Sequence, residues 1–115
     1  MNYDVLIPVR TGNTRLPGKA LKQIDGKEII FYLIDRLKTC KNIRKVIVCT
    51  TSLPSDDLLS ELLSRKKIDF FRGSEKDILD RFYSTSKKFE TDFIINVDGD
   101  DIYTDPFYID EMVQH

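Results

Sequence analysis

The segment RTGNTRLPGK (10–19) gathers three positive charges in ten residues that also contain two glycines. Glycine lets backbone N–H groups approach an anion, while guanidinium and ammonium groups neutralise its charge. Arg10, Arg15 and Lys19, spaced around Gly12 and Gly18, therefore favour binding of a triphosphate. The alternative is a solvated basic surface loop, which is disfavoured because the segment directly follows a short apolar run.

Two common phosphate-binding motifs do not fit this segment. The G-x-x-x-x-G-K-[ST] pattern fails because Gly12 and Gly18 are one residue too far apart and Ala20 occupies the Ser or Thr position. The G-x-G-x-x-G pattern cannot be written over the segment either, which removes the main support for a dinucleotide site.

The segment NVDGDDIYTDP (96–106) crowds carboxylates at the end of another apolar run. Across a parallel sheet from a triphosphate loop, such carboxylates suit a Mg²⁺ ion that bridges phosphate oxygens. Asp100 is the preferred metal ligand, and strand alternation puts Asp98 on the same face. The alternative is an Asp-rich turn, and Asp105 before Pro106 has the pattern of a helix N-cap.

Two weaker signals lie elsewhere in the chain. In FFRGSEKDILDRF (70–82), Asp77 and Arg81 are four residues apart, so an ordinary helical ion pair is the simplest interpretation. The run TTS (50–52) places three hydroxyls where a strand meets a loop. They could contact a base or ribose, but Thr and Ser are also common turn residues.

Short apolar runs alternate with amphipathic segments along the chain. The runs predict buried parallel strands at 3–9, 45–51, 68–73 and 92–99. Apolar residues three and four apart predict helices over 27–40, 55–67 and 74–89. Ser55 is the predicted N-cap of the second helix. This alternation predicts an α/β three-layer fold, whose ligands bind beyond the carboxyl ends of the strands.

Composition excludes several classes of protein. The 115 residues include 18 Lys or Arg and 19 Asp or Glu, for a formal charge of −1, which gives no electrostatic reason to expect nucleic-acid binding. No apolar run approaches the roughly 18 residues of a membrane span, and the first residues lack a signal-peptide pattern, so we expect a cytoplasmic protein. Cys40, Cys49 and His115 are too few for a disulfide framework or a zinc site.

We expect a single domain over residues 1–115. The final stretch, 105–115, begins like another helix and then stops, and four short strands make a thin sheet. These features predict a partial, truncated domain.

The motifs together resemble those of the cytidylyltransferases that activate sugars, especially the acylneuraminate and spore-coat-polysaccharide type. The shared pattern comprises R-L-P-G-K (15–19), a G-K turn (26–27), T-[ST] at a strand end (50–52), R-G-S-E-x-D-x-L-x-R (72–81) and G-D (99–100). It covers almost the whole chain, and the first and fourth of these motifs are specific. The resemblance implies a Rossmann-like fold of the nucleotide-diphospho-sugar transferase type, with a mostly parallel sheet.

The resemblance also implies an activity and a site. The activity is Mg²⁺-dependent transfer of CMP from CTP to a sugar or sugar acid for surface polysaccharide biosynthesis, with release of pyrophosphate. Arg10, Arg15 and Lys19 would bind the triphosphate, with Lys19 and Arg15 as catalytic residues. Asp100 would bind Mg²⁺, with Asp98 as a second candidate. The other residues implied to line the nucleotide pocket are Pro8, Val9, Thr50, Ser52, Arg72, Gly73, Asp77 and Arg81.

Two alternatives stay open. Members of this family are longer, and their remaining part supplies the acceptor pocket and the contacts of a homodimer, so the chain could be a non-catalytic nucleotide-binding or interaction module. It could also be a sugar-1-phosphate nucleotidyltransferase that uses another nucleoside triphosphate. Such enzymes carry a G-x-G-T-R-L-x-P loop, which GNTR (12–15) copies only in part.

Overall fold

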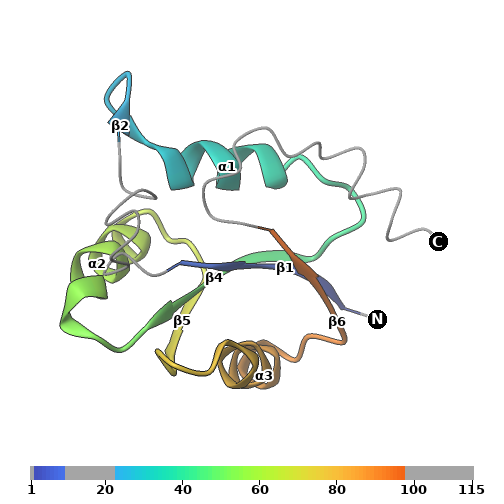
Figure 1. Ribbon diagram of the computed structural model, residues 1–115. Helices are drawn as coiled ribbons and strands as arrows, with labels where there is room; N and C mark the ends of the chain where they lie inside the picture. The colour runs from blue at the N-terminus through green and yellow to red at the C-terminus, as the bar shows by residue number, and fades with distance from the viewer. Residues whose placement is uncertain (1, 10–22, 98–115) are drawn as a thin grey trace.

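A computed structural model describes residues 2–9 and 23–97 of the chain. Its central four-stranded sheet has the order β5-β4-β1-β6, with every neighbouring pair parallel (Figure 1). The strands are β1 (Tyr3–Pro8), β4 (Lys45–Thr51), β5 (Phe70–Gly73) and β6 (Phe93–Asn96). Each lies within one of the four apolar runs identified in the sequence, so the predicted parallel sheet is confirmed.

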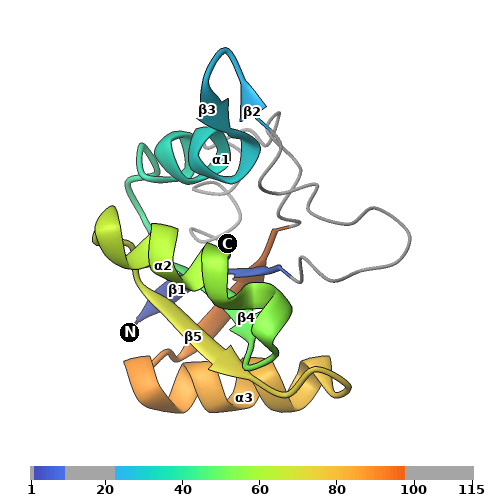
Figure 2. The ribbon, with the colours of Figure 1, turned by 90° about the vertical axis from the view of Figure 1, so that its left-hand side faces the viewer.

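Helices cover both faces of this sheet, as Figures 1 and 2 show. They are α1 (Ile29–Leu37), α2 (Asp57–Arg65) and α3 (Ile78–Phe89). Alternate residues of a strand point to opposite faces, so a strand between two helical layers must be apolar throughout. A parallel sheet with helices on both faces has three layers, so the predicted three-layer α/β fold is confirmed. Within residues 2–9 and 23–97, none of the helices combines the length and the apolar character needed to cross a membrane.

The two helical layers build two separate apolar cores. On the α1 and α2 side, Val5 and Val48 of the sheet pack in one cluster with Ile34 of α1 and Leu63 of α2. On the α3 side, a smaller cluster is formed by Leu6, Ile47 and Cys49 of the sheet with Phe82 and Phe89 of α3.

A two-stranded antiparallel hairpin that we did not predict precedes α1. Strands β2 (Gln23–Ile24) and β3 (Lys27–Glu28) are joined by Asp25 and Gly26, whose φ angles are 54° and 81°. Positive φ at both central residues is typical of a tight Asp-Gly hairpin turn. The hairpin includes residues 27 and 28, so the helix predicted over 27–40 begins two residues later than expected.

The other two predicted helices also begin later than expected. Ser55 is not an N-cap, because it lies in the short 3-10 helix η2 (Pro54–Asp56), and Asp56 is the residue that precedes α2. The third helix begins after Asp77, whose carboxylate accepts a hydrogen bond from the Asp80 N–H at 3.0 Å. Residues 74–77 therefore belong to the loop that leads into α3.

A buried carboxylate joins three strands at the amino-terminal edge of the sheet. Asp4 of β1 is fully buried and accepts hydrogen bonds from Arg44 Nε at 3.1 Å, Arg44 Nη2 at 2.6 Å and the Lys45 N–H at 3.1 Å. The Thr91 hydroxyl, just before β6, donates to the same carboxylate. Burial raises the pKa of Asp4, but the hydrogen bonds from Arg44 and Thr91 outweigh it, so this pKa lies below its ordinary value.

Candidate functional site

Predicted nucleotide-binding residues from three segments meet where neighbouring strands end. Pro8 lies opposite Cys49 in the register of β1 and β4, and Val9 donates its N–H to the Cys49 carbonyl at 2.9 Å. On the other side of β4, Thr50 lies opposite Arg72 of β5. The register therefore brings 8–9, 50–52 and 72–73 to one edge, at the carboxyl ends of the strands. This is the edge at which parallel α/β sheets bind ligands.

Thr50, near the end of β4, is fully buried with an unsatisfied hydroxyl. Among the residues that the structure describes, its Oγ1 has no hydrogen-bond partner. Such an atom costs about 1–3 kcal/mol in desolvation, and native proteins contain few of them. The candidate site thus includes a buried polar atom that finds no hydrogen-bond partner within residues 2–9 and 23–97.

The chain leaves β4 through a turn that side chains hold in place. The Thr51 hydroxyl donates a hydrogen bond to the carboxylate of Asp56, which is fully buried, and accepts one from the Leu53 N–H at 3.3 Å. Ser52 donates its N–H to the Gly73 carbonyl at 3.3 Å. Sequence reasoning missed Asp56, since the only signal, the run S-D-D at 55–57, was interpreted as the start of a helix.

Arg72 reaches from β5 across the end of β4 to the same turn. Its Nε donates to the Thr51 carbonyl at 2.7 Å, and its Nη2 donates to the Leu53 carbonyl at 2.9 Å and to Asp57 Oδ1 at 2.7 Å. The side chain is 27% exposed. A contact of Arg72 with a nucleotide stays a prediction.

Arg81 of α3 is buried beneath the same edge, with only 4% of its surface exposed. The guanidinium donates to three backbone carbonyls, those of Ser74 at 2.9 Å, Glu75 at 3.3 Å and Cys49 at 3.4 Å. It thereby joins the loop before α3 to the end of β4. Burial raises the pKa of the adjacent Cys49 thiol to about 11, so this thiol is protonated at neutral pH.

Gly73 and Asp77 shape the loop that connects β5 to α3. A Cβ atom on Gly73 would lie 3.0 Å from Phe71 Cε1 and 3.1 Å from Arg81 Cγ, so glycine lets the backbone pass close to these side chains. Asp77 caps α3, as described above, and its carbonyl accepts the Arg81 N–H at 3.1 Å. The spacing of four between Asp77 and Arg81 therefore places both residues at the first turn of a helix.

The remaining predicted site residues lie outside the described ones. They are Arg10, Arg15, Lys19, Asp98 and Asp100. Within residues 2–9 and 23–97, no group of three or more His, Cys, Asp or Glu side chains is arranged to bind a metal ion. The metal site at Asp100 and Asp98 therefore stays a prediction.

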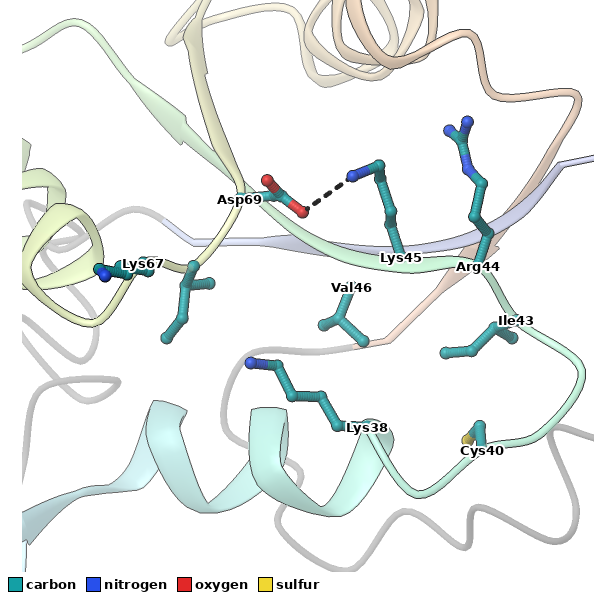
Figure 3. Close-up of a pocket in the computed structure, with 9 residues that line it drawn as sticks. Lys38, Cys40, Ile43, Arg44, Lys45, Val46, Lys67 and Asp69 are labelled. Carbon is teal, nitrogen blue, oxygen red and sulfur yellow. Dashed lines mark hydrogen bonds and ion pairs between the residues drawn. The ribbon is translucent and has the colours of Figure 1, made fainter.

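A pocket of about 220 Å³ lies at the opposite, amino-terminal edge of the sheet, and several basic residues line it. Figure 3 shows that these residues diverge, because Arg44 and Lys45 extend on one side of β4 and Lys38 lies on the other. Arg44 pairs with Asp4 at 2.6 Å, and Lys45 pairs with Asp69 at 3.5 Å. Charges that diverge and are partly neutralised do not suit a triphosphate, so the carboxyl edge is the better candidate.

Comparison with known proteins identifies relatives of the chain. The profile of the cytidylyltransferase family matches residues 5–115. The spore coat polysaccharide biosynthesis protein SpsF of Bacillus subtilis is 31% identical over 113 residues, which cover 95% of this chain and 47% of that protein.

Two solved structures superpose on almost the whole chain. A cytidylyltransferase from Leptospira borgpetersenii has a TM-score of 0.91 and 33% identity, over 99% of this chain and 48% of that one. A CMP:2-keto-3-deoxy-manno-octonic acid synthetase complexed with CTP has a TM-score of 0.82 and 26% identity, over 99% and 46%. These superpositions confirm the expected nucleotide-diphospho-sugar transferase type of fold. The chain spans about half the length of the relatives that it matches.

Proposed function

The chain belongs to the cytidylyltransferase family, and from this premise we propose that it forms the nucleotide-binding part of an enzyme that transfers CMP from CTP to a sugar or sugar acid. Pyrophosphate is the second product. The observation that carries the proposal is the meeting of 8–9, 50–52 and 72–73 at one edge of the sheet. From this edge the chain continues directly into the basic segment 10–19.

Two further observations support the choice of substrates. The relative solved with CTP covers 99% of this chain, which supports a cytidine nucleotide. That relative is named for an acid sugar, which supports a sugar acid as the acceptor. The acceptor pocket and the contacts of a homodimer would come from the part of the relatives that the chain does not span.

In this proposal the basic segment neutralises the triphosphate. Arg10, Arg15 and Lys19 would bind its oxygens, and Lys19 with Arg15 would stabilise the charge that develops during attack at the α-phosphate. Phosphoryl transfer needs little covalent help from a protein, because positioning of the acceptor in line and electrostatic stabilisation supply most of the rate.

Mg²⁺ is the proposed cofactor, with Asp100 as its ligand and Asp98 as a second candidate. A bound Mg²⁺ ion neutralises charge on phosphate oxygens. We expect EDTA to weaken CTP binding to the wild-type chain and to have no effect on an Asp100→Asn variant. Isothermal titration calorimetry measures both affinities, and equal sensitivity of the two proteins to EDTA would contradict the assignment of Asp100.

Titration of the chain with CTP, UTP, ATP and GTP, with and without Mg²⁺, tests the nucleotide proposal. We expect selective binding of CTP, and about tenfold weaker binding in Lys19→Ala and in Arg15→Ala, because each loses a charge-assisted hydrogen bond. Lys38→Ala is the matched control, since it removes the same charge at the opposite edge of the sheet. Equal CTP affinity in the wild type and in both site variants would contradict the proposal.

The same titration separates the two alternatives. A preference for UTP or GTP over CTP would favour a sugar-1-phosphate nucleotidyltransferase. Binding of CTP without release of pyrophosphate in the presence of any sugar acid would favour a non-catalytic nucleotide-binding module.

A further inference from the structure

Two of the predicted nucleotide-binding residues lie at the point where β4 ends, Thr50 in the strand and Ser52 in the turn that follows it, and the neighbouring strand β5 contacts this turn. Thr50 and Ser52 flank Thr51, and the Thr51 carbonyl accepts the hydrogen bond from Arg72 Nε at 2.7 Å. A second bond from Arg72 reaches the Leu53 carbonyl, and a third reaches Asp57 in the first turn of α2. One guanidinium therefore contacts the end of β4, the loop and the helix that follows.

The geometry of these bonds requires arginine. The guanidinium is planar and presents its N–H groups in a rigid fork, whereas the ammonium group of lysine is a compact charge on a flexible stem. Ser52 also donates to the Gly73 carbonyl of β5, at 3.3 Å from its N–H and 3.5 Å from its hydroxyl. Both are longer than the three bonds made by Arg72, so Arg72 supplies the stronger part of the attachment.

We propose that Arg72 is a positioning residue of the candidate site, which acts by holding residues 51–57 and so sets the position of Ser52, beside Thr50 at the end of β4, for the nucleotide. This role rests on the proposed binding of CTP. This role differs from a direct contact with the nucleotide because it also involves Asp57. Asp57 lies on α2 and is 67% exposed, but its ion pair with Arg72 helps to hold the turn.

Asp57 distinguishes the two roles. If Arg72 acts through the turn, removing the Asp57 carboxylate loosens one of its three anchors and weakens CTP binding. If Arg72 contacts CTP directly, the Asp57 carboxylate only offsets its charge, so removing that carboxylate leaves the affinity unchanged or increases it.

The test is a double-mutant cycle of Arg72→Ala and Asp57→Ala with two measurements. Amide hydrogen exchange of residues 52–57 without nucleotide reports on the attachment of the turn, and calorimetry reports on CTP affinity. We expect Arg72→Ala to speed exchange and weaken CTP binding by about tenfold, because all three bonds to the turn are lost, and Asp57→Ala to do so by less, because one is lost. The effect of Asp57→Ala should vanish when Arg72 is already alanine. Arg72→Lys should recover only part of either loss.

A control variant and a second test variant keep the outcomes separate. Asp4→Asn lowers global stability at the opposite edge, so a merely structural effect would appear there too, whereas we expect its CTP affinity to match that of the wild type. Should Arg72→Ala fail to fold, the exposed Asp57 variant still decides between the roles.

Unchanged exchange at 52–57 in both single variants would overturn the positioning role. Loss of CTP affinity in Arg72→Ala with wild-type affinity in Asp57→Ala would overturn it as well. Absence of CTP binding by the wild-type chain would overturn the proposed function, and exchange measured without nucleotide would still report whether Arg72 holds the turn.

Discussion

The two edges of the parallel sheet use their polar groups in different ways. At the amino edge, the buried carboxylate of Asp4 accepts hydrogen bonds from Arg44, Lys45 and Thr91, and these bonds join the starts of three strands. At the carboxyl edge, the buried hydroxyl of Thr50 has no partner among the described residues. The satisfied network stabilises the sheet, while the unsatisfied group lies where the ligand is expected.

The arginines at the two edges, Arg44 and Arg72, also bind different kinds of partner. Arg44 pairs with the buried carboxylate of Asp4 in the central strand β1, so it stabilises the sheet. Arg72 binds two carbonyls of a surface turn and an exposed carboxylate, so its work is to hold the turn at the site. We therefore expect the largest loss of stability from a substitution in the Asp4 network and losses of CTP binding from substitutions at the carboxyl edge.

The largest expected effect is that of Asp4→Asn at the amino edge. This substitution keeps the shape of the side chain but breaks a buried ion pair, which costs about 3 kcal/mol of unfolding free energy. Urea denaturation measures the loss. The control, Asp69→Asn, breaks the half-exposed pair with Lys45 and should cost no more than about 0.5 kcal/mol. A loss at Asp4 as small as that at Asp69 would contradict the assignment of Asp4 as the carboxylate that holds the amino edge together.

The pH dependence of stability tests whether the carboxylate of Asp4 supplies this stabilisation. Because the pKa of Asp4 is lower in the folded chain than in the unfolded one, the stabilisation is fully present above the ordinary Asp value of about 3.9. It is lost as the pH falls through the lower, folded value. Urea denaturation at a series of pH values should show a constant stability gap between the wild type and Asp4→Asn from about pH 5 to 7, and a shrinking gap below about pH 4. A gap that widens on acidification would contradict the lowered pKa.

The smallest expected effects come from the neighbouring threonines of β4, and they have opposite signs. Thr51→Val removes the hydroxyl that donates to buried Asp56 and should lower the free energy of unfolding by about 1–2 kcal/mol. Thr50→Val removes a buried hydroxyl that has no partner in the described part of the chain and should raise it by about 1 kcal/mol. Thermal and urea denaturation of the two variants measure both changes. Destabilisation by Thr50→Val would mean that its hydroxyl is satisfied, and the contrast between the edges would then disappear.

The strands could be predicted from the sequence more accurately than the helix starts. An apolar run between polar turns is a local signal, and each observed strand lies within one. A helix start depends on the residue that precedes it. Ser55 is the N-cap that the sequence predicts, but it lies in the short 3-10 helix, and Asp56 precedes α2 without a side-chain capping bond. The hairpin at 23–28 escaped prediction because each of its strands has two residues, too few to show alternation.

The sequence motifs nominate residues for the candidate site, whose nucleotide contacts stay predictions, but they do not give the hydrogen bonds that these residues make. Motif resemblance assigned Thr50, Ser52, Arg72 and Arg81 to one pocket, and the structure places these residues around the ends of β4 and β5. That Arg72 and Arg81 bind backbone carbonyls could not be predicted, because their partners are up to 32 residues away in sequence. The sequence gives no signal for the role of Asp4, because its partners Arg44 and Thr91 are 40 and 87 residues away.

The sequence by itself determined the alternation of apolar runs and amphipathic segments, the three-layer fold that follows from it, and the motifs that identify the family. Only the tertiary structure decided that β4 lies between β1 and β5, that Asp4 joins three strands and that Arg72 holds the turn after β4. The physical reason is that apolar periodicity depends on neighbours along the chain. Hydrogen bonds of buried charges depend on groups that become neighbours only when the sheet forms.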